Sequence, residues 1–128
     1  MNKKILIIDD EADLTKLLSN FLSRDNTVYS AADGEHGLRL FEKHKPDLVL
    51  LDVNLPGQSG IDVLRAILES DGNAVVVMLS SSPFLDLARQ TIKMGASDYI
   101  SKPFDFGDLK EKLSKHLNRA PKTSYNRR

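Results

Sequence analysis

The chain has 128 residues, of which 41% are hydrophobic and 28% are charged, so it can bury the core of one domain of ordinary size. Lys and Arg number 18 and Asp and Glu number 18, and this balance provides no overall attraction to nucleic acid or to an acidic membrane. The absence of cysteine excludes a disulfide framework, a thiol nucleophile and a cysteine-based zinc site.

The apolar runs of the chain are short. The longest, such as residues 74–79, fall far below the roughly 20 residues that cross a bilayer, so we expect no membrane insertion. The apolar part of the N-terminal segment covers only Ile5 to Ile8 before acids follow, which is typical of a first strand and not of a signal peptide. Together with the lack of cysteine, this favours a cytoplasmic protein.

Strand and helix patterns alternate along the chain. Apolar or β-branched runs predict buried strands, and apolar residues at i, i+3, i+4 and i+7 predict amphipathic helices. The expected strands cover residues 4–8, 27–32, 48–51, 73–80 and 97–101. The expected helices cover residues 14–22, 34–43, 61–68, 84–95 and 106–117. This alternation predicts an α/β fold with a parallel sheet covered by helices on both faces.

Two further expectations concern the helices. The buried side of the fourth helix is assigned to Phe84, Leu85, Ala88, Ile92 and Gly95. Leu87 and Met94, seven residues apart, are expected to point outward, which indicates an interface there. The three histidines lack acid or cysteine partners at metal-ligand spacing, so we expect surface positions for His36, His44 and His116.

The helical periodicity ends after Leu117. The closing segment NRAPKTSYNRR is polar, contains Pro121 and has four basic residues without an acid. We therefore expect one domain over residues 1–119, followed by a flexible basic tail or the start of a linker over 120–128. Four basic residues in a loose segment do not make a nucleic-acid site, so we expect no direct nucleic-acid binding.

Polar side chains stand at the ends of four expected strands. Asp9 and Asp10 follow the first strand and Asp52 follows the third, while Ser80 ends the fourth and Lys102 comes just after the fifth. The carboxyl ends of the strands in an open α/β sheet share one edge, where ligands bind. We therefore expect these residues to lie close together.

Their chemistry points to a metal and a phosphate. Neighbouring carboxylates repel one another, and a divalent cation such as Mg²⁺ relieves this because it prefers hard oxygen ligands and often bridges carboxylates to phosphate. A lysine and a hydroxyl beside them suit phosphate oxygens. The pattern predicts phosphoryl transfer to or from a carboxylate.

Four motifs contain these residues and follow one another along the chain: ILIIDDE (5–11), PDLVLLDVNLPGQSG (46–60), VVVMLSS (75–81) and GASDYISKPF (95–104). In this order and spacing they resemble the receiver domain of two-component response regulators. The resemblance covers about residues 3–118. It implies a doubly wound, flavodoxin-like (βα)5 fold with strand order 2-1-3-4-5, and a signalling phosphoacceptor that catalyses only its own phosphoryl transfer and dephosphorylation.

The resemblance also implies a role for each matching residue. Asp52 is the phosphoacceptor. Asp9, Asp10, Asp52 and the backbone carbonyl of Asn54 form a site for Mg²⁺, for which Mn²⁺ can substitute. Phosphorylation comes from a sensor histidine kinase or a histidine phosphotransfer protein.

The switch residues come from the last two strands. Ser80 matches the hydroxyl that bonds a phosphoryl oxygen, and Lys102 matches the lysine that pairs with the phosphoryl group. Tyr99 matches an aromatic residue that swings inward as the hydroxyl moves. Pro103 matches a proline preceded by a cis peptide bond, which proline tolerates.

One departure from the family pattern concerns the residues after the switch hydroxyl. The family usually has Ala at the position of Ser81, and Ser82 follows it. Together with Asn54, these residues are expected to tune the rate of dephosphorylation. The resemblance also implies an output face made of the fourth helix, fifth strand and fifth helix, read by an unidentified effector, in a monomer or a phosphorylation-dependent dimer.

The sequence disfavours two other functions and leaves a third as the alternative. A phosphatase of the haloacid dehalogenase type requires a second acid two residues after Asp52, where this chain has Asn54. A flavodoxin-like nucleotide or flavin binder requires a glycine-rich loop after the first strand, where this chain has DDEAD. A degenerate receiver that signals by protein binding without phosphorylation stays the alternative.

Overall fold

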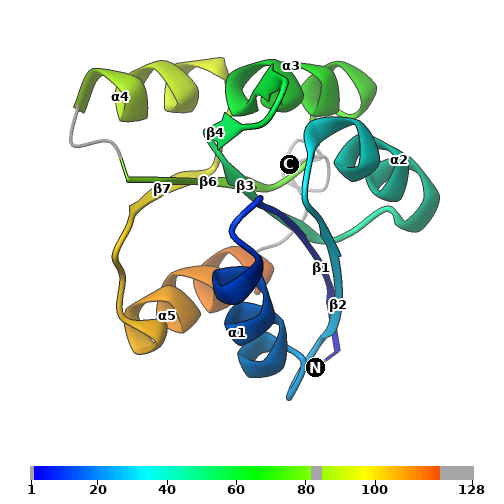
Figure 1. The fold of residues 1–128 in the computed structure, drawn as a ribbon, viewed down its shortest axis with the longest axis vertical. Coiled ribbons are helices and arrows are strands. Elements are labelled where there is room, and N and C mark those ends of the chain that lie inside the picture. The colour runs from blue at the N-terminus through cyan, green and yellow to red at the C-terminus, as the bar shows by residue number, and fades with distance from the viewer. Residues whose placement is uncertain (1, 82–84, 119–128) are drawn as a thin grey trace, which may run out of the picture.

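A central sheet organises residues 2–81 and 85–118, which the computed structural model describes. Its strands are β1 (Lys4–Ile8), β2 (Thr27–Ala31), β3 (Leu48–Asp52), β6 (Val76–Ser80) and β7 (Asp98–Ser101). All neighbouring strands are parallel, in the order β2-β1-β3-β6-β7 (Figure 1). These are the five expected strands in the expected order 2-1-3-4-5, so the predicted fold class is confirmed.

Five helices cover the two faces of the sheet. One face carries α1 (Ala12–Leu22) and α5 (Phe106–Leu117), and the other carries α2 (Gly34–His44), α3 (Gly60–Ser70) and α4 (Leu85–Met94) (Figure 1). Within the part of the chain that the structure describes, none of the helices has the length and apolar character of a membrane span.

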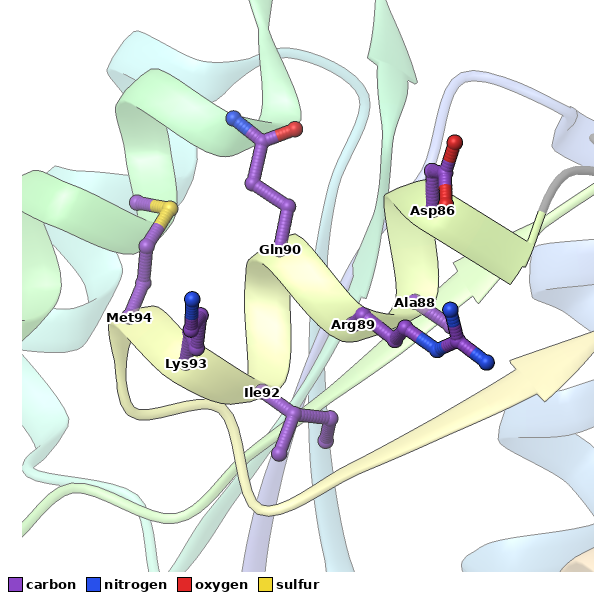
Figure 2. A pocket seen from close by; sticks show the side chains of 7 residues that line it. All are labelled: Asp86, Ala88, Arg89, Gln90, Ile92, Lys93 and Met94. Carbon is purple, nitrogen blue, oxygen red and sulfur yellow. The ribbon is translucent and has the colours of Figure 1, made fainter.

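The buried side of α4 differs from the prediction. Leu85 and Ile92, which were expected to be buried, are 70% and 44% exposed. Leu87 and Met94 instead pack against the core, and Figure 2 shows Met94 and Ile92 on different sides of the helix. Thr91 takes the central buried position because its hydroxyl donates to the backbone carbonyls of Leu87 and Ala88, at 3.1 and 3.0 Å.

The surface position expected for His116 is also wrong. Its side chain is 5% exposed, and its Nε2 lies 2.9 Å from Oδ2 of Asp98 on β7. Burial would raise the pKa of Asp98, but the hydrogen bond with His116 and a backbone N–H keep it below its usual value. His36 is exposed as expected, whereas His44 is half-buried and stacks on Tyr29.

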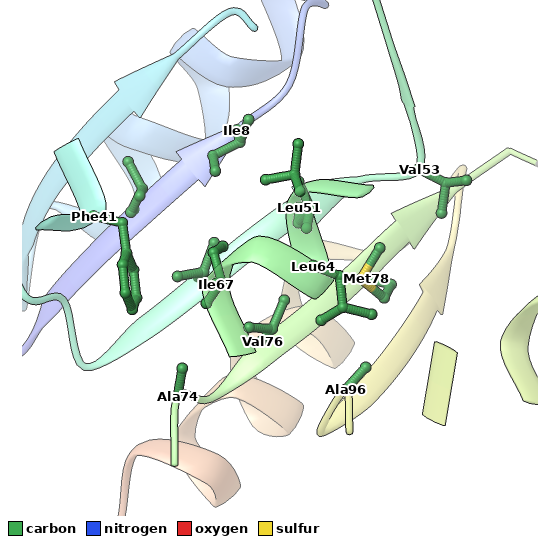
Figure 3. Close-up of a cluster of buried hydrophobic side chains, with 13 residues drawn as sticks. Ile8, Phe41, Leu51, Val53, Leu64, Ile67, Ala74, Val76, Met78 and Ala96 are labelled. Atoms are coloured by element: carbon green, nitrogen blue, oxygen red, sulfur yellow. The ribbon is translucent and has the colours of Figure 1, made fainter. Parts of the chain in front are cut away.

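The core lies in two layers, one on each side of the sheet. Side chains alternate between the two faces along each strand, so β1, β3 and β6 contribute to both layers. Figure 3 shows the layer in which Leu51 and Met78 of the sheet meet Leu64 and Ile67 of α3. Burial on both faces explains why these strands are continuous apolar runs in the sequence.

A small hairpin follows β3 and was not predicted as strands. Its strands β4 (Asn54–Leu55) and β5 (Gln58–Ser59) are antiparallel. Residues 56 and 57 join them, and Gly57 adopts a positive φ of 74° that glycine allows without strain. The hairpin brings the chain from the end of β3 to the start of α3.

Some expectations lie outside the described residues. They concern Ser82, Phe84 and the segment 119–128, which includes the expected tail and the last residue of the expected domain.

Gly60 allows the chain to pass close beneath the end of β3. A Cβ atom at this position would lie 2.1 Å from the backbone oxygen of Asp52 and 2.7 Å from Cα of Val53. We expect Gly60→Ala to destabilise the domain by about 2 kcal/mol or more in urea unfolding, because the new methyl group meets backbone and not a flexible side chain.

Gly72→Ala is the matched control. The nearest atom to its added Cβ would be the backbone oxygen of Leu68 at 3.9 Å, which is an ordinary contact. This variant should stay within about 0.5 kcal/mol of the wild type. Equal stability of the Gly60 and Gly72 variants would contradict the close approach at the end of β3.

Candidate functional site

The ends of four strands meet at one edge of the sheet. Asp52 is the last residue of β3 and Ser80 the last of β6, while Asp9 follows β1 and Lys102 follows β7. The parallel register places Ile8 of β1 beside Leu51 of β3, so both strands end at the same level. The structure therefore brings together the residues that the sequence pattern singled out.

Three carboxylates form a cluster at this edge. One oxygen each from Asp9, Asp10 and Asp52 lies within 4.8 Å of the others. Asp9 and Asp52 are buried, at 2% and 5% exposure, whereas Asp10 is exposed. Hard oxygen donors that are partly open to water fit Mg²⁺, which keeps several of its waters when it binds to protein.

Lys102 is the cation that faces this cluster. Its Nζ donates to Oδ2 of Asp9 at 2.9 Å and to Oδ2 of Asp52 at 3.3 Å, and it also contacts Oε1 of Glu11. Burial alone would lower the pKa of Lys102. Hydrogen bonds to Glu11 and Asp9 and the charges of Asp9 and Asp52 outweigh this and raise the pKa, so the side chain stays protonated.

The surroundings of Asp52 disfavour the charged form of its carboxyl group. Burial, with the charge of Asp9 acting in the same direction, raises the pKa of its carboxyl group from 3.8 to a net value of about 6. The backbone N–H of Asn54 donates to Oδ1 at 3.1 Å and, with Lys102, offsets part of this rise. A carboxylate held partly desolvated is less stabilised than one in water, which favours its reaction with an electrophile.

Backbone groups of the loop after β1 and of the end of β2 fix the position of Asp9. Its Oδ1 accepts a hydrogen bond from the N–H of Glu11 at 2.9 Å, and its own N–H donates to the carbonyl of Ala31 at 3.0 Å. The carboxylate therefore has one oxygen directed to the backbone and the other to Lys102.

The remaining expected site residues lie on and after β6 and β7. Ser80 is fully buried, and its carbonyl accepts from the N–H of Lys102 at 2.8 Å. The Lys102–Pro103 peptide bond is cis. Tyr99 is half-buried against the core, and its hydroxyl is buried without a hydrogen bond to any described residue. Ser81 is exposed at the end of β6.

Sequence reasoning missed one residue of the site. Glu11 directly follows the acid pair in the motif ILIIDDE, yet no role was assigned to it. Its contact with Lys102 joins positions 91 residues apart in the chain. The only signal in the sequence was a third consecutive acid after the first strand.

The family of the chain follows from a comparison with known domains. The model of the response regulator receiver domain matches residues 5–114. The chain belongs to the response regulator receiver domain family. Receiver domains are signalling phosphoacceptors that interact with histidine kinases and effectors and bind Mg²⁺ at an acidic pocket.

Individual relatives are similar over almost the whole of this receiver domain. Sporulation initiation phosphotransferase F of Bacillus subtilis is 34% identical over 118 residues, a match that covers 91% of this chain and 95% of that protein. A crystal structure of a response regulator receiver domain protein from Clostridium thermocellum is 34% identical with a TM-score of 0.86, covering 91% of this chain and 95% of the other.

Other relatives are about twice as long. The alkaline phosphatase synthesis transcriptional regulatory protein PhoP of Bacillus subtilis is 36% identical over 121 residues, which are 94% of this chain and 50% of the relative. This receiver domain therefore spans nearly all of some relatives and about half of others.

The raised pKa of Asp52 predicts a pH-dependent effect of its removal. We expect Asp52→Asn to stabilise the metal-free receiver domain near pH 7.5 by about 1 to 3 kcal/mol, because it removes a buried charge whose pKa lies about two units high. As the pH falls from 6 toward 4, native Asp52 binds a proton that the unfolded chain does not, so the difference should shrink. Urea unfolding in chelator at several pH values measures this.

Two results would contradict this electrostatic description. One is an Asp52→Asn variant that is less stable than the wild type near pH 7.5. The other is a stability difference that stays constant as the pH is lowered.

Proposed function

We propose that this receiver domain accepts a phosphoryl group on Asp52 from the phosphohistidine of a sensor histidine kinase or a histidine phosphotransfer protein. A carboxylate oxygen of Asp52 forms the new bond to phosphorus while the phosphorus–nitrogen bond breaks, and the electron pair stays on the imidazole nitrogen. The observation that carries the proposal is the contact of Lys102 with buried Asp52 inside a cluster of three carboxylates. We expect this exchange in the cytoplasm.

Asp9, Asp10 and Asp52 would hold Mg²⁺ together with the backbone carbonyl of Asn54, and Mn²⁺ would substitute for it. The close approach of three hard oxygen donors supports this assignment. The bound ion supplies positive charge that balances the carboxylates and the phosphoryl oxygens.

Lys102 and Ser80 would recognise the phosphoryl group. The raised pKa of Lys102 keeps a positive charge beside Asp52, and an ammonium group donates well to phosphoryl oxygens. The hydroxyl of Ser80, at the end of the adjacent strand, would donate to another oxygen. These new contacts shift the domain toward its active state, and Tyr99 follows the movement of Ser80.

The signal would be read on the face made by α4, β7 and α5. The exposure of Leu85 and Ile92 on α4 supports this surface, because both are large apolar side chains that a partner could cover. The partner is a downstream effector, and the domain acts as a monomer or as a phosphorylation-dependent dimer.

Hydrolysis would reset the domain. Water attacks the phosphorus of the acyl phosphate, the bond to the Asp52 oxygen breaks, and inorganic phosphate leaves. Asn54 and Ser81 are exposed near Asp52 and Ser80, which supports a role in controlling the access of water. Ser82, outside the described residues, is proposed to act with them.

The alternative is a degenerate receiver that binds partners without being phosphorylated. It is less well supported, because Asp9, Asp10, Asp52, Ser80 and Lys102 are all present in this chain and gather at one sheet edge.

Phosphorylation can be tested by intact mass. Incubation with acetyl phosphate and Mg²⁺ should add one phosphoryl group to the wild type, and excess chelator should prevent the addition. Asp52→Asn should add none, because its amide is a poor nucleophile. Asp62→Asn is the control, since Asp62 is an exposed acid on α3 that pairs with Arg65 and is not one of the three clustered carboxylates, and it should behave as the wild type.

Two outcomes would contradict the proposal. The first is a wild type that gains no mass under any of these conditions, which favours the degenerate receiver. The second is Mg²⁺-dependent phosphorylation of Asp52→Asn with an unchanged yield, which places the acceptor elsewhere.

A further inference from the structure

Glu11 contacts the proposed phosphoryl site but has no role in the transfer described above. It lies at the start of α1, directly after Asp10, and its side chain is 58% exposed. Its carboxylate accepts a hydrogen bond from Nζ of Lys102. The lysine that would recognise the phosphoryl group is therefore shared with an acid that stands outside the metal cluster.

The hydrogen-bonding capacity of Lys102 is fully used. An ammonium group has three N–H donors, and Nζ contacts one oxygen each of Asp9, Glu11 and Asp52. A phosphoryl group on Asp52 can take over the donor that now contacts Asp52 itself, but it gains a second hydrogen bond from Lys102 only if the contact to Asp9 or to Glu11 is given up.

Of Asp9 and Glu11, Glu11 is the easier partner to release. The side chain of Asp9 is 0% exposed, so loss of Lys102 would leave a buried charge without its cation. The carboxylate of Glu11, in contrast, can rotate away from Lys102 and be hydrated. Its ion pair with Lys102 contributes little to stability, because the Glu11 side chain is largely exposed.

The start of α1 shows that Glu11 is used for this contact and not for capping. Glu11 occupies the N-cap position, and its side chain makes no capping hydrogen bond. The N-caps of α2, α3 and α5 are the short residues Asp33, Ser59 and Asp105, and each accepts a hydrogen bond from a backbone N–H of its helix. At α1 the longer side chain reaches Lys102 instead.

We propose that Glu11 is a positioning residue that holds Lys102 in the unphosphorylated domain and is displaced when a phosphoryl group arrives. Glu11 competes with the phosphoryl group for the same donor, so it opposes the phosphorylated state and limits its population. This inference rests on the proposed phosphorylation of Asp52.

Three variants distinguish the effect of the contact between Glu11 and Lys102 from the effect of the negative charge of Glu11. Glu11→Gln removes the charge and weakens the contact. Glu11→Asp keeps the charge, but its shorter side chain withdraws from Lys102 and suits the N-cap. Asp13→Asn is the control, because Asp13 is an exposed acid in the same first turn of α1.

The probe is beryllium fluoride with Mg²⁺, which mimics a phosphoryl group on a carboxylate without turnover. Titrations followed by the backbone amide signals in NMR spectra give its affinity. Glu11→Gln and Glu11→Asp should both bind it several-fold more tightly than the wild type, and Asp13→Asn should match the wild type. Glu11→Asp should also raise the melting temperature, because α1 gains a cap.

Each other outcome counts against the inference. Tighter binding by Glu11→Gln with wild-type binding by Glu11→Asp would mean that charge alone acts. Equal affinities in all variants, or an equal gain in Asp13→Asn, would exclude competition for Lys102. These results leave phosphorylation of Asp52 intact. A wild type that neither binds the probe nor gains mass with acetyl phosphate would instead overturn the proposed function, and this inference with it.

Discussion

The ion pairs of Lys102 with two buried carboxylates are the interaction on which the site depends. Asp9 and Asp52 repel each other in surroundings that screen charge poorly, and Lys102 offsets part of this repulsion at 2.9 and 3.3 Å. One lysine cannot balance both of them together with Asp10. The sheet edge therefore keeps excess negative charge, which suits a divalent cation and leaves Asp52 with a raised pKa of about 6.

The fold can hold this unfavourable arrangement because the strands behind it are buried on both faces. Side chains such as Ile8 and Leu51 are fully buried, and each contributes about 1.5 to 3 kcal/mol by leaving water. The same strands set the level at which Asp9 and Asp52 meet. Gly60 lets the chain return beneath the end of β3, so the backbone near Asp52 is tightly packed. The free energy gained by burying the core thus offsets the electrostatic repulsion among the carboxylates of the site.

The sheet and the strand-end residues could be predicted from the sequence because they follow from periodicity and from the shared edge of parallel strands. Features that depend on single distant contacts could not be predicted. Thr91 can be buried because its hydroxyl donates to backbone carbonyls of its own helix. With Thr91 on the buried side of α4, Ile92 lies on the exposed side. His116 can be buried because Asp98 on β7 provides a hydrogen-bond partner for its ring. Glu11 belongs to the site because it contacts Lys102, which lies 91 residues later in the chain.

The central claim is that a buried strand presents Asp52, and no other acid of the cluster, to a phosphoryl donor. Borohydride reduction of the domain after incubation with acetyl phosphate and Mg²⁺, followed by peptide mass mapping, tests this directly, because it converts an aspartyl phosphate into homoserine. Phosphorylation of Asp52 predicts homoserine at position 52 alone. Homoserine at position 9 or 10, or its complete absence from a domain that has gained a phosphoryl group, would contradict it.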